Sequence, residues 1–178
     1  WLRLKTGNKA TSLLNARNTL TQRTFGPACS GAIRMDISNM QNGDVAGLGS
    51  LSFKYGYIAV KKNGEKAELQ MVDASANDTE KKEDKPVVKE SVDCTKEDIV
   101  YLKEDFNFAG NADGSDKDTV AFYYSFDGKE WKKLGDTMKL SYELVHFMGS
   151  KFAIFNYATV KSGGYVDVDY FNVSDKIT

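Results

Sequence analysis

The stretch VAFYYSFDGKEWKKL (residues 120–134) places an Asp-Gly dipeptide between two runs rich in aromatic and aliphatic side chains. Asp-Gly and Asn-Gly dipeptides favour tight turns, because their positive backbone φ angles suit the twist of two paired strands. The stretch therefore predicts a β-hairpin whose loop is Asp127-Gly128. A second stretch, YIAVKKNGEKAELQMV (57–72), carries Asn63-Gly64 in the same setting and predicts a second hairpin.

The role of Trp131 in the first hairpin has two interpretations. With Asp127-Gly128 as a two-residue loop, Tyr124 lies opposite Trp131, on a face shared with Phe122 and Phe126. Such an aromatic face is typical of an interior, and we expect Trp131 to be a core residue. The alternative is a platform for a sugar ring, because aromatic faces stack on the apolar C–H faces of sugars.

The rest of the chain carries similar short runs and no sustained helical period. Further strands are predicted at 1–6, 13–22, 29–37, 44–53, 86–92, 98–106, 151–158 and 165–173. About a dozen strands joined by turns indicate an all-β fold, an antiparallel two-sheet β-sandwich of the jelly-roll type. We expect a single domain over residues 1–178. The charged stretch 73–85 has no apolar anchor and predicts a mobile hairpin tip.

Charge and hydropathy exclude several classes of partner. The 178 residues carry a formal net charge of −1, with acidic and basic residues interspersed. Phosphate backbones and anionic membranes require a one-signed basic patch, so we expect no nucleic acid and no membrane as partner. No apolar run approaches the ~20 residues that span a bilayer. The opening WLRLKTG lacks an initiator Met, and we interpret the chain as a piece of a longer polypeptide.

Nucleophiles and soft metal ligands are few. Cys29 and Cys94 lie far apart in the sequence, a spacing that leaves open two thiols or a single bridge. His146 is the only histidine and precedes a predicted strand. Without a Ser or Cys in a nucleophile motif, it predicts no catalytic triad.

The last predicted strand, YVDVDYFNV (165–173), alternates sharply. Val166, Val168 and Tyr170 point one way, and Asp167 and Asp169 point the other, about 7 Å apart. A glycosidase needs two carboxyls that flank the scissile bond, but the expected third acidic residue is missing, so we expect no catalysis by this pair. A structural calcium ion held partly by Asp169 is a second hypothesis, because Ca²⁺ takes oxygen ligands from neighbouring strands and loops. Ion pairs with Lys or Arg are the third.

Two other segments offer contact residues. RNTLTQRTFGPAC (17–29) sets Arg23 and Phe25 directly before Gly26-Pro27, so Phe25 is either a core residue or a contact fixed by a turn. The strand KFAIFNYA (151–158) carries apolar side chains on both faces. One face can meet the opposite sheet, and the other needs a loop, a ligand or another domain as cover.

These segments suggest a shallow sugar site. In it Phe25 or Tyr157 would stack on a sugar ring, while Arg23, His146 and Asn156 would hydrogen-bond its hydroxyls. The alternative is that Tyr157 is core, that Asn156 satisfies a strand edge, and that Arg23 and Phe25 form an interface with another domain.

Five blocks carry a family resemblance, in order and across nearly the whole chain. They are LLNARNTLTQRTFGPACSG (13–31), DVAGLGSLSFKYGYIAVKK (44–62), VAFYYSFDGKEWKKLG (120–135), HFMGSKFAIFNYAT (146–159) and GGYVDVDYF (163–171). Together they resemble the C-terminal β-sandwich of glycoside hydrolase family 43 enzymes, which include β-xylosidases and α-L-arabinofuranosidases.

The resemblance implies a concanavalin A-like fold and an accessory role. The family's catalytic residues lie on an N-terminal β-propeller, so the chain is expected to be non-catalytic. Its implied partners are xylan-type plant cell-wall polysaccharide or xylo-oligosaccharide and the propeller of the same polypeptide. QRTFGP is similar in position to a loop that approaches the substrate pocket, which favours contact roles for Arg23 and Phe25. A bacterial secreted, periplasmic or cell-surface location is implied as well.

Overall fold

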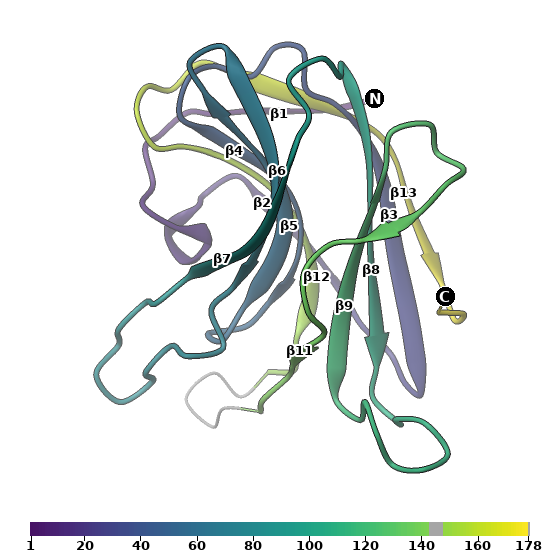
Figure 1. The fold of residues 1–178 in the computed structure, drawn as a ribbon. Helices are drawn as coiled ribbons and strands as arrows, with labels where there is room; N and C mark the ends of the chain where they lie inside the picture. Colours follow the sequence, from purple (N-terminus) through teal and green to yellow (C-terminus); the bar gives the residue numbers. More distant parts are fainter. Residues whose placement is uncertain (143–147, 178) are drawn as a thin grey trace.

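The structure, a computed structural model, describes residues 1–142 and 148–177. Two antiparallel sheets face each other (Figure 1). One sheet is ordered β1 (Leu2–Lys5), β13 (Tyr165–Ser174), β3 (Ala28–Asp36), β8 (Ile99–Asn107), β9 (Thr119–Ser125) and β10 (Lys132–Lys133), with β11 (Met138–Lys139) also paired to β9. The other is ordered β2 (Thr19–Arg23), β12 (Lys151–Ala158), β4 (Asp44–Leu51), β5 (Gly56–Asn63), β6 (Lys66–Asp73) and β7 (Val87–Asp93). The predicted two-sheet antiparallel sandwich is confirmed.

The interior lies between the two sheets, where period-two alternation sends one set of side chains from each strand. Ile33 and Phe122 of the seven-stranded sheet belong to the same buried cluster as Leu48 of the six-stranded sheet. The rings of Phe106 and Phe152 meet edge to face across the interior, with centroids 5.0 Å apart. Cys29 and Cys94 are buried free thiols, so the single-bridge alternative is wrong.

A second apolar cluster covers the outer face of the six-stranded sheet. The segment before β2, which contains the 3-10 turn η1 (Leu13–Asn15), packs Leu13 against Phe155 and its neighbours on this face. Figure 1 shows the segment in purple, on the side of the six-stranded sheet that faces away from the other sheet. The strand 151–158 is therefore covered on both faces, by the opposite sheet and by this segment.

The hairpin at Asn63-Gly64 is confirmed, with its loop one residue further along the chain. Asn63 pairs with Lys66, so Gly64 and Glu65 form the two-residue loop between β5 and β6. Gly64 has a φ of 61°, the left-handed conformation that glycine adopts without steric cost.

The hairpin at Asp127-Gly128 has a longer loop than predicted. Tyr124 pairs with Lys132, so it does not lie opposite Trp131. The Asp127 carboxylate accepts the backbone N–H groups of Lys129 and Glu130 at 2.8 and 2.9 Å, and these bonds lower its pKa to about 2. The Asp127 side chain thus organises the wider loop.

Trp131 is only half-buried and lies outside the core. The ammonium of Lys103 lies 5.0 Å from the centroid of its ring, on the outer face of the seven-stranded sheet. Phe122 and Tyr124 do face the interior. The prediction of a core Trp131 is wrong, because a register shift by one residue turns a side chain to the other face.

A β-bulge at Asp169 changes the alternation of the last strand. Val168 pairs with Met35 and Tyr170 pairs with the next residue of β3, Arg34, which leaves Asp169 as the extra residue. Phe171 then packs on the core, 5.6 Å from the Phe152 ring centroid. The prediction that Tyr170 shares the face of Val166 and Val168 is wrong for this reason.

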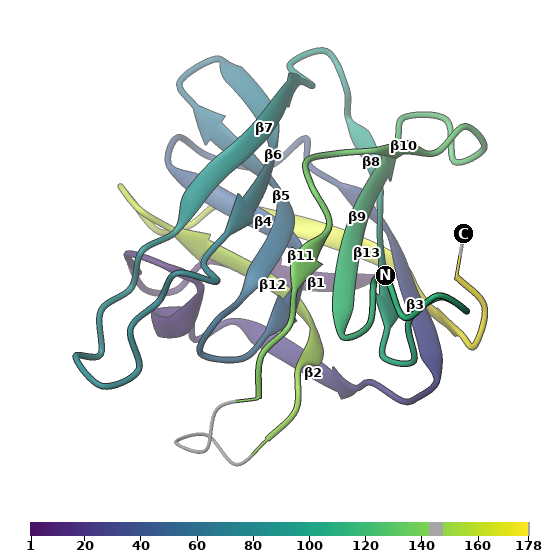
Figure 2. The same cartoon turned by 60° about the horizontal axis from the view of Figure 1, so that its bottom comes forward.

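The connection between β6 and β7 contains the predicted tip at 73–85. Figure 2 shows it as a long teal loop beyond the sheet. Its base is anchored, contrary to expectation: Ala74 and Asn77 are buried, and the Asn77 amide donates to the Phe53 carbonyl at 2.7 Å and accepts the Lys85 N–H at 2.6 Å. Mobility of the remaining tip stays a prediction. Within residues 1–142 and 148–177, no helix is long and apolar enough to cross a membrane.

Candidate functional site

The segment that follows β2 presents a large apolar side chain to solvent. The Thr24 hydroxyl donates to the Ser150 carbonyl at 2.7 Å, and the Phe25 N–H donates to the Cys29 sulfur at 3.5 Å. These bonds hold the chain at Phe25 and at the residue directly before it, yet Phe25 is 43% exposed. The core alternative for Phe25 is therefore wrong, and its position suits a contact.

Two cations line a hollow beside Thr24, the residue directly before Phe25. Arg23 pairs in register with Lys151 of β12, so both side chains leave the same, outer face of the six-stranded sheet. Neither cation forms an ion pair with any residue that the structure describes. A hollow of about 330 Å³ lies between them, lined by Arg23, Thr24, Met148, Gly149, Ser150 and Lys151. We call Phe25 together with this hollow the Arg23–Phe25 surface.

Asn156 and Tyr157 do not join this surface. Asn156 is fully buried on the inner face of β12, where its amide donates to the Leu4 carbonyl at 2.7 Å. Tyr157 lies on the outer face but six residues along β12 from Lys151, roughly 20 Å away at the rise of a strand. The shallow site expected from Arg23, Phe25, Asn156 and Tyr157 together is therefore not formed, and His146 lies outside the described residues.

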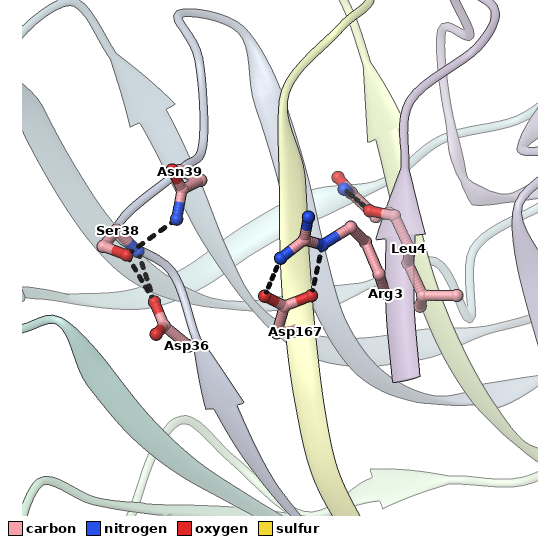
Figure 3. Close-up of polar contacts among 7 residues, drawn as sticks. Arg3, Leu4, Asp36, Ser38, Asn39 and Asp167 are labelled. Atoms are coloured by element: carbon pink, nitrogen blue, oxygen red, sulfur yellow. Dashed lines mark hydrogen bonds and ion pairs between the residues drawn. The ribbon is translucent and has the colours of Figure 1, made fainter. Parts of the chain in front are cut away.

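Each aspartate of the last strand has an arginine partner. Asp167 accepts two hydrogen bonds from Arg3, both 2.8 Å long, as Figure 3 shows, and these bonds lower its pKa. Asp169 pairs with Arg34 at 3.1 Å. The pair favours the ion-pair alternative for Asp169, and the structural calcium ion stays a prediction. Among the residues that the structure describes, no three Asp, Glu, His or Cys side chains gather as a metal site.

Comparison with known proteins decides the family. The family model described as "Beta xylosidase C-terminal Concanavalin A-like domain" matches residues 1–174. The chain belongs to this family. A β-xylosidase of Formosa agariphila is 28% identical over 162 residues, which cover 88% of this chain and 23% of that protein.

Solved structures of family 43 proteins share the fold of this C-terminal domain. A bifunctional GH43-CE protein of Bacteroides eggerthii is 42% identical, with a TM-score of 0.88 over 99% of this chain and 21% of its own. An engineered GH43 glycoside hydrolase with endo-xylanase and exo-arabinofuranosidase activity is 31% identical, with a TM-score of 0.85 over 97% of this chain and 34% of its own. The chain thus spans between about a fifth and a third of these relatives.

Sequence reasoning missed a second group of polar and aromatic residues on this C-terminal domain. Tyr55, Tyr57 and Tyr157 gather on the outer face of the six-stranded sheet, and of the three only Tyr157 belongs to β12, six residues from Lys151. The sequence YGYIAVK (55–61) carried a signal, since its odd-numbered residues share a face and include both Tyr55 and Tyr57. The contribution of Tyr157 depends on strand order, which local sequence does not show.

Proposed function

We propose that this chain is a non-catalytic accessory module that packs on the catalytic domain of a xylan-degrading enzyme through the Arg23–Phe25 surface. The observation that carries the proposal is the exposed Phe25 ring, in a segment held by two hydrogen bonds and close to two cations that form no ion pair with a described residue. Aromatic residues and arginine are enriched at the centres of protein interfaces, where they supply most of the binding free energy.

Family membership supports the accessory role. The matching model is named for the C-terminal domain of β-xylosidases, and relatives with the same fold are three to five times longer, as the 34% and 21% coverages indicate. We propose that the remainder of the parent polypeptide includes a catalytic β-propeller. The arginine pairs of Asp167 and Asp169 favour a structural role for these carboxylates over hydrolysis.

Phe25→Ala tests the proposal in the polypeptide that joins this chain to its catalytic domain. We expect kcat/KM on xylo-oligosaccharides to fall about ten-fold, because an interface anchor of this size is worth at least ~1.4 kcal/mol. The melting temperature of the isolated chain should not change, since Phe25 lies outside both buried clusters.

Val173→Ala is the matched control, because Val173 is an exposed apolar residue of the other sheet. It should leave kcat/KM unchanged. Equal kinetics of Phe25→Ala and the unmutated polypeptide would contradict the proposal. A loss of 3 to 5 kcal/mol in the isolated Phe25→Ala chain, the cost typical of a core Phe, would contradict it as well.

Binding of xylan-type carbohydrate by the chain itself is a second candidate function. The residues expected to build a sugar site are dispersed, but the tyrosine cluster on the outer face of the six-stranded sheet favours such a site elsewhere.

A further inference from the structure

A hollow of about 190 Å³ opens on the outer face of the six-stranded sheet. Its floor is formed by side chains of four adjacent strands, Tyr157 of β12, Val45 of β4, Tyr57 of β5 and Val72 of β6. These side chains lie on one face because they are in register, Tyr157 opposite Val45 and Tyr57 opposite Val72. Paired strands thus fix the floor.

The walls come from the segment before β2 and the end of β12 on one side, and from the start of β7 on the other. Thr11 and Ser12 form one wall together with Thr159, while Pro86 and Val88 form the other. The rim carries Lys61 and Gln70. Lys61 lies on the same face of β5 as Tyr57, and Gln70 lies on the same face of β6 as Val72. At about 190 Å³ the hollow is smaller than the about 300–1,000 Å³ of pockets that enclose drug-sized ligands, and it suits one ring of a longer molecule.

The aromatic side chains are packed in a fixed arrangement. The rings of Tyr55 and Tyr57 are stacked with centroids 6.0 Å apart, and those of Phe155 and Tyr157 are stacked at 5.9 Å. An edge contact between Tyr57 and Phe155 at 5.2 Å joins the two stacks. A ligand at this surface would meet side chains that have already lost their conformational freedom.

Hydroxyl groups converge at the hollow. The Tyr55 hydroxyl donates to the Asp84 carboxylate, with oxygen distances of 3.0 and 3.3 Å. Burial raises the pKa of Tyr57 and Tyr157, so both phenols stay protonated across the physiological pH range. The Tyr157 hydroxyl donates to that of Tyr57, and the Tyr157 oxygen keeps the capacity to accept a hydrogen bond from a ligand hydroxyl.

Ser12 also lines the hollow and is 6% exposed. Its hydroxyl donates to the Tyr55 oxygen, and the Tyr55 hydroxyl donates in turn to Asp84. A ligand hydroxyl would therefore meet oxygen atoms whose positions are already fixed.

We propose that this hollow binds one ring of a neutral oligosaccharide chain. Hydroxyl and amide groups of the lining complement sugar hydroxyls, which both donate and accept, while Val72 and Pro86 offer apolar contact to the ring's C–H groups. Lys61 at the rim and Asp84, which accepts the Tyr55 hydroxyl beside the hollow, carry opposite charges, which favours an uncharged ligand. The site rests on the second candidate function above and is separate from the Arg23–Phe25 surface.

The experiment is a titration of the ¹⁵N-labelled chain with xylohexaose and, in parallel, with cellohexaose, followed by amide chemical shifts. We expect amide shift changes at Tyr57, Gln70 and Thr159 with at least one of the two sugars. The sugar that causes them identifies which polysaccharide the hollow recognises. Tyr157→Phe removes one hydroxyl and keeps the ring, so affinity should fall about five-fold, the worth of one hydrogen bond.

Tyr165→Phe is the matched control, because Tyr165 lies on the seven-stranded sheet, and it should bind as the unmutated chain does. If Tyr157→Phe lowers the melting temperature, its loss of affinity could reflect lost stability. Gln70→Ala then tests the site, because it changes only the rim. The proposal is overturned if neither sugar shifts any amide at millimolar concentration, or if Tyr157→Phe and Gln70→Ala both bind with unchanged affinity. Chemical-shift changes confined to residues 23–25 and 148–151 would overturn it too, because the sugar would then bind at the Arg23–Phe25 surface and not in this hollow.

Discussion

Glu104 is an acidic residue in the apolar interior of the sandwich. It lies on β8 between Leu102 and Phe106, which belong to the core, and it is fully buried. Neither carboxylate oxygen forms a hydrogen bond with a residue that the structure describes. Burial, and then the neighbouring charge of Asp105, raise its pKa well above the usual value of 4.5. Glu104 is therefore protonated in the folded protein at pH values where the unfolded chain has released the proton.

This difference gives the stability of the protein a defined pH dependence. Because the folded state binds more protons, the free energy of unfolding should decrease as pH rises above the unfolded-state pKa and through the raised folded-state pKa. Glu104→Leu should stabilise the protein by about 1–3 kcal/mol near neutral pH, since it removes an unpaired polar group from the core. The gain should shrink toward acidic pH, where both states hold the proton.

Urea unfolding at neutral and acidic pH measures this effect. Glu104→Gln is the control, because it keeps the size of the side chain and removes its titration, so the pH dependence should flatten. A Glu104→Leu protein less stable than the unmutated chain at neutral pH would contradict the account of this residue.

Asp169 supports a second prediction at this scale. Its partner is Arg34, so EDTA should leave the melting temperature of the chain unchanged, and Asp169→Asn should lower stability by no more than about 1 kcal/mol, as for other exposed ion pairs. Thermal melts with and without EDTA check both outcomes. A melting temperature that falls in EDTA, with the response lost in Asp169→Asn, would restore the calcium hypothesis.

At the scale of elements, the hairpin of β9 and β10 separates a core aromatic from a surface aromatic. Phe122 is fully buried, whereas Trp131 lies half-buried against Lys103. Phe122→Ala should cost about 3–5 kcal/mol and Trp131→Ala about 0.5–1.5 kcal/mol, because the latter loses mainly a surface cation–π contact. Chemical denaturation of the two variants measures the difference. Equal losses would mean that the register of this hairpin is wrong.

Strand positions could be predicted from alternation and turn residues, but register could not. Gly64 marks the first hairpin because glycine tolerates positive φ, yet the loop begins one residue later than the Asn-Gly pair suggested. At Asp127 the side chain itself accepts two backbone N–H groups and widens the loop. The bulge at Asp169 depends on pairing with β3, a partner more than a hundred residues away in sequence. Each of these features is decided by contacts that a local pattern does not contain.

The candidate site was predictable only in part. The local pattern of the Arg23–Phe25 segment, a polar run before a Gly-Pro break, left Phe25 open between core and contact, and only the family resemblance favoured the exposed position that the structure shows. The grouping of Asn156 with Tyr157 was an error that period-two alternation already excludes, since adjacent residues of a strand face opposite sides. The tyrosine hollow needed the order of β12, β4, β5 and β6, which no local signal supplies.

At the scale of the whole molecule, both proposed surfaces belong to the outer face of the six-stranded sheet. The segment around η1 covers part of this face, and Leu13 belongs to the same buried cluster as Phe155. The Arg23–Phe25 surface lies at the Lys151 end of β12 beside β2, whereas the tyrosine hollow extends from Tyr157 over β4, β5 and β6, and the two hollows share no lining residue. A docked domain and a sugar chain could therefore be held at the same time.

The central claim is that the Arg23–Phe25 surface is the docking surface of the domain. Backbone hydrogen exchange, measured on the chain alone and on the longer polypeptide with its catalytic domain, tests it most directly. Exchange reports burial of each amide, so docking should slow it at residues 23–25 and 148–151 and leave the outer face of β8 and β9 unchanged. Unaltered exchange at residues 23–25 and 148–151, with new protection on β8 and β9, would contradict the claim.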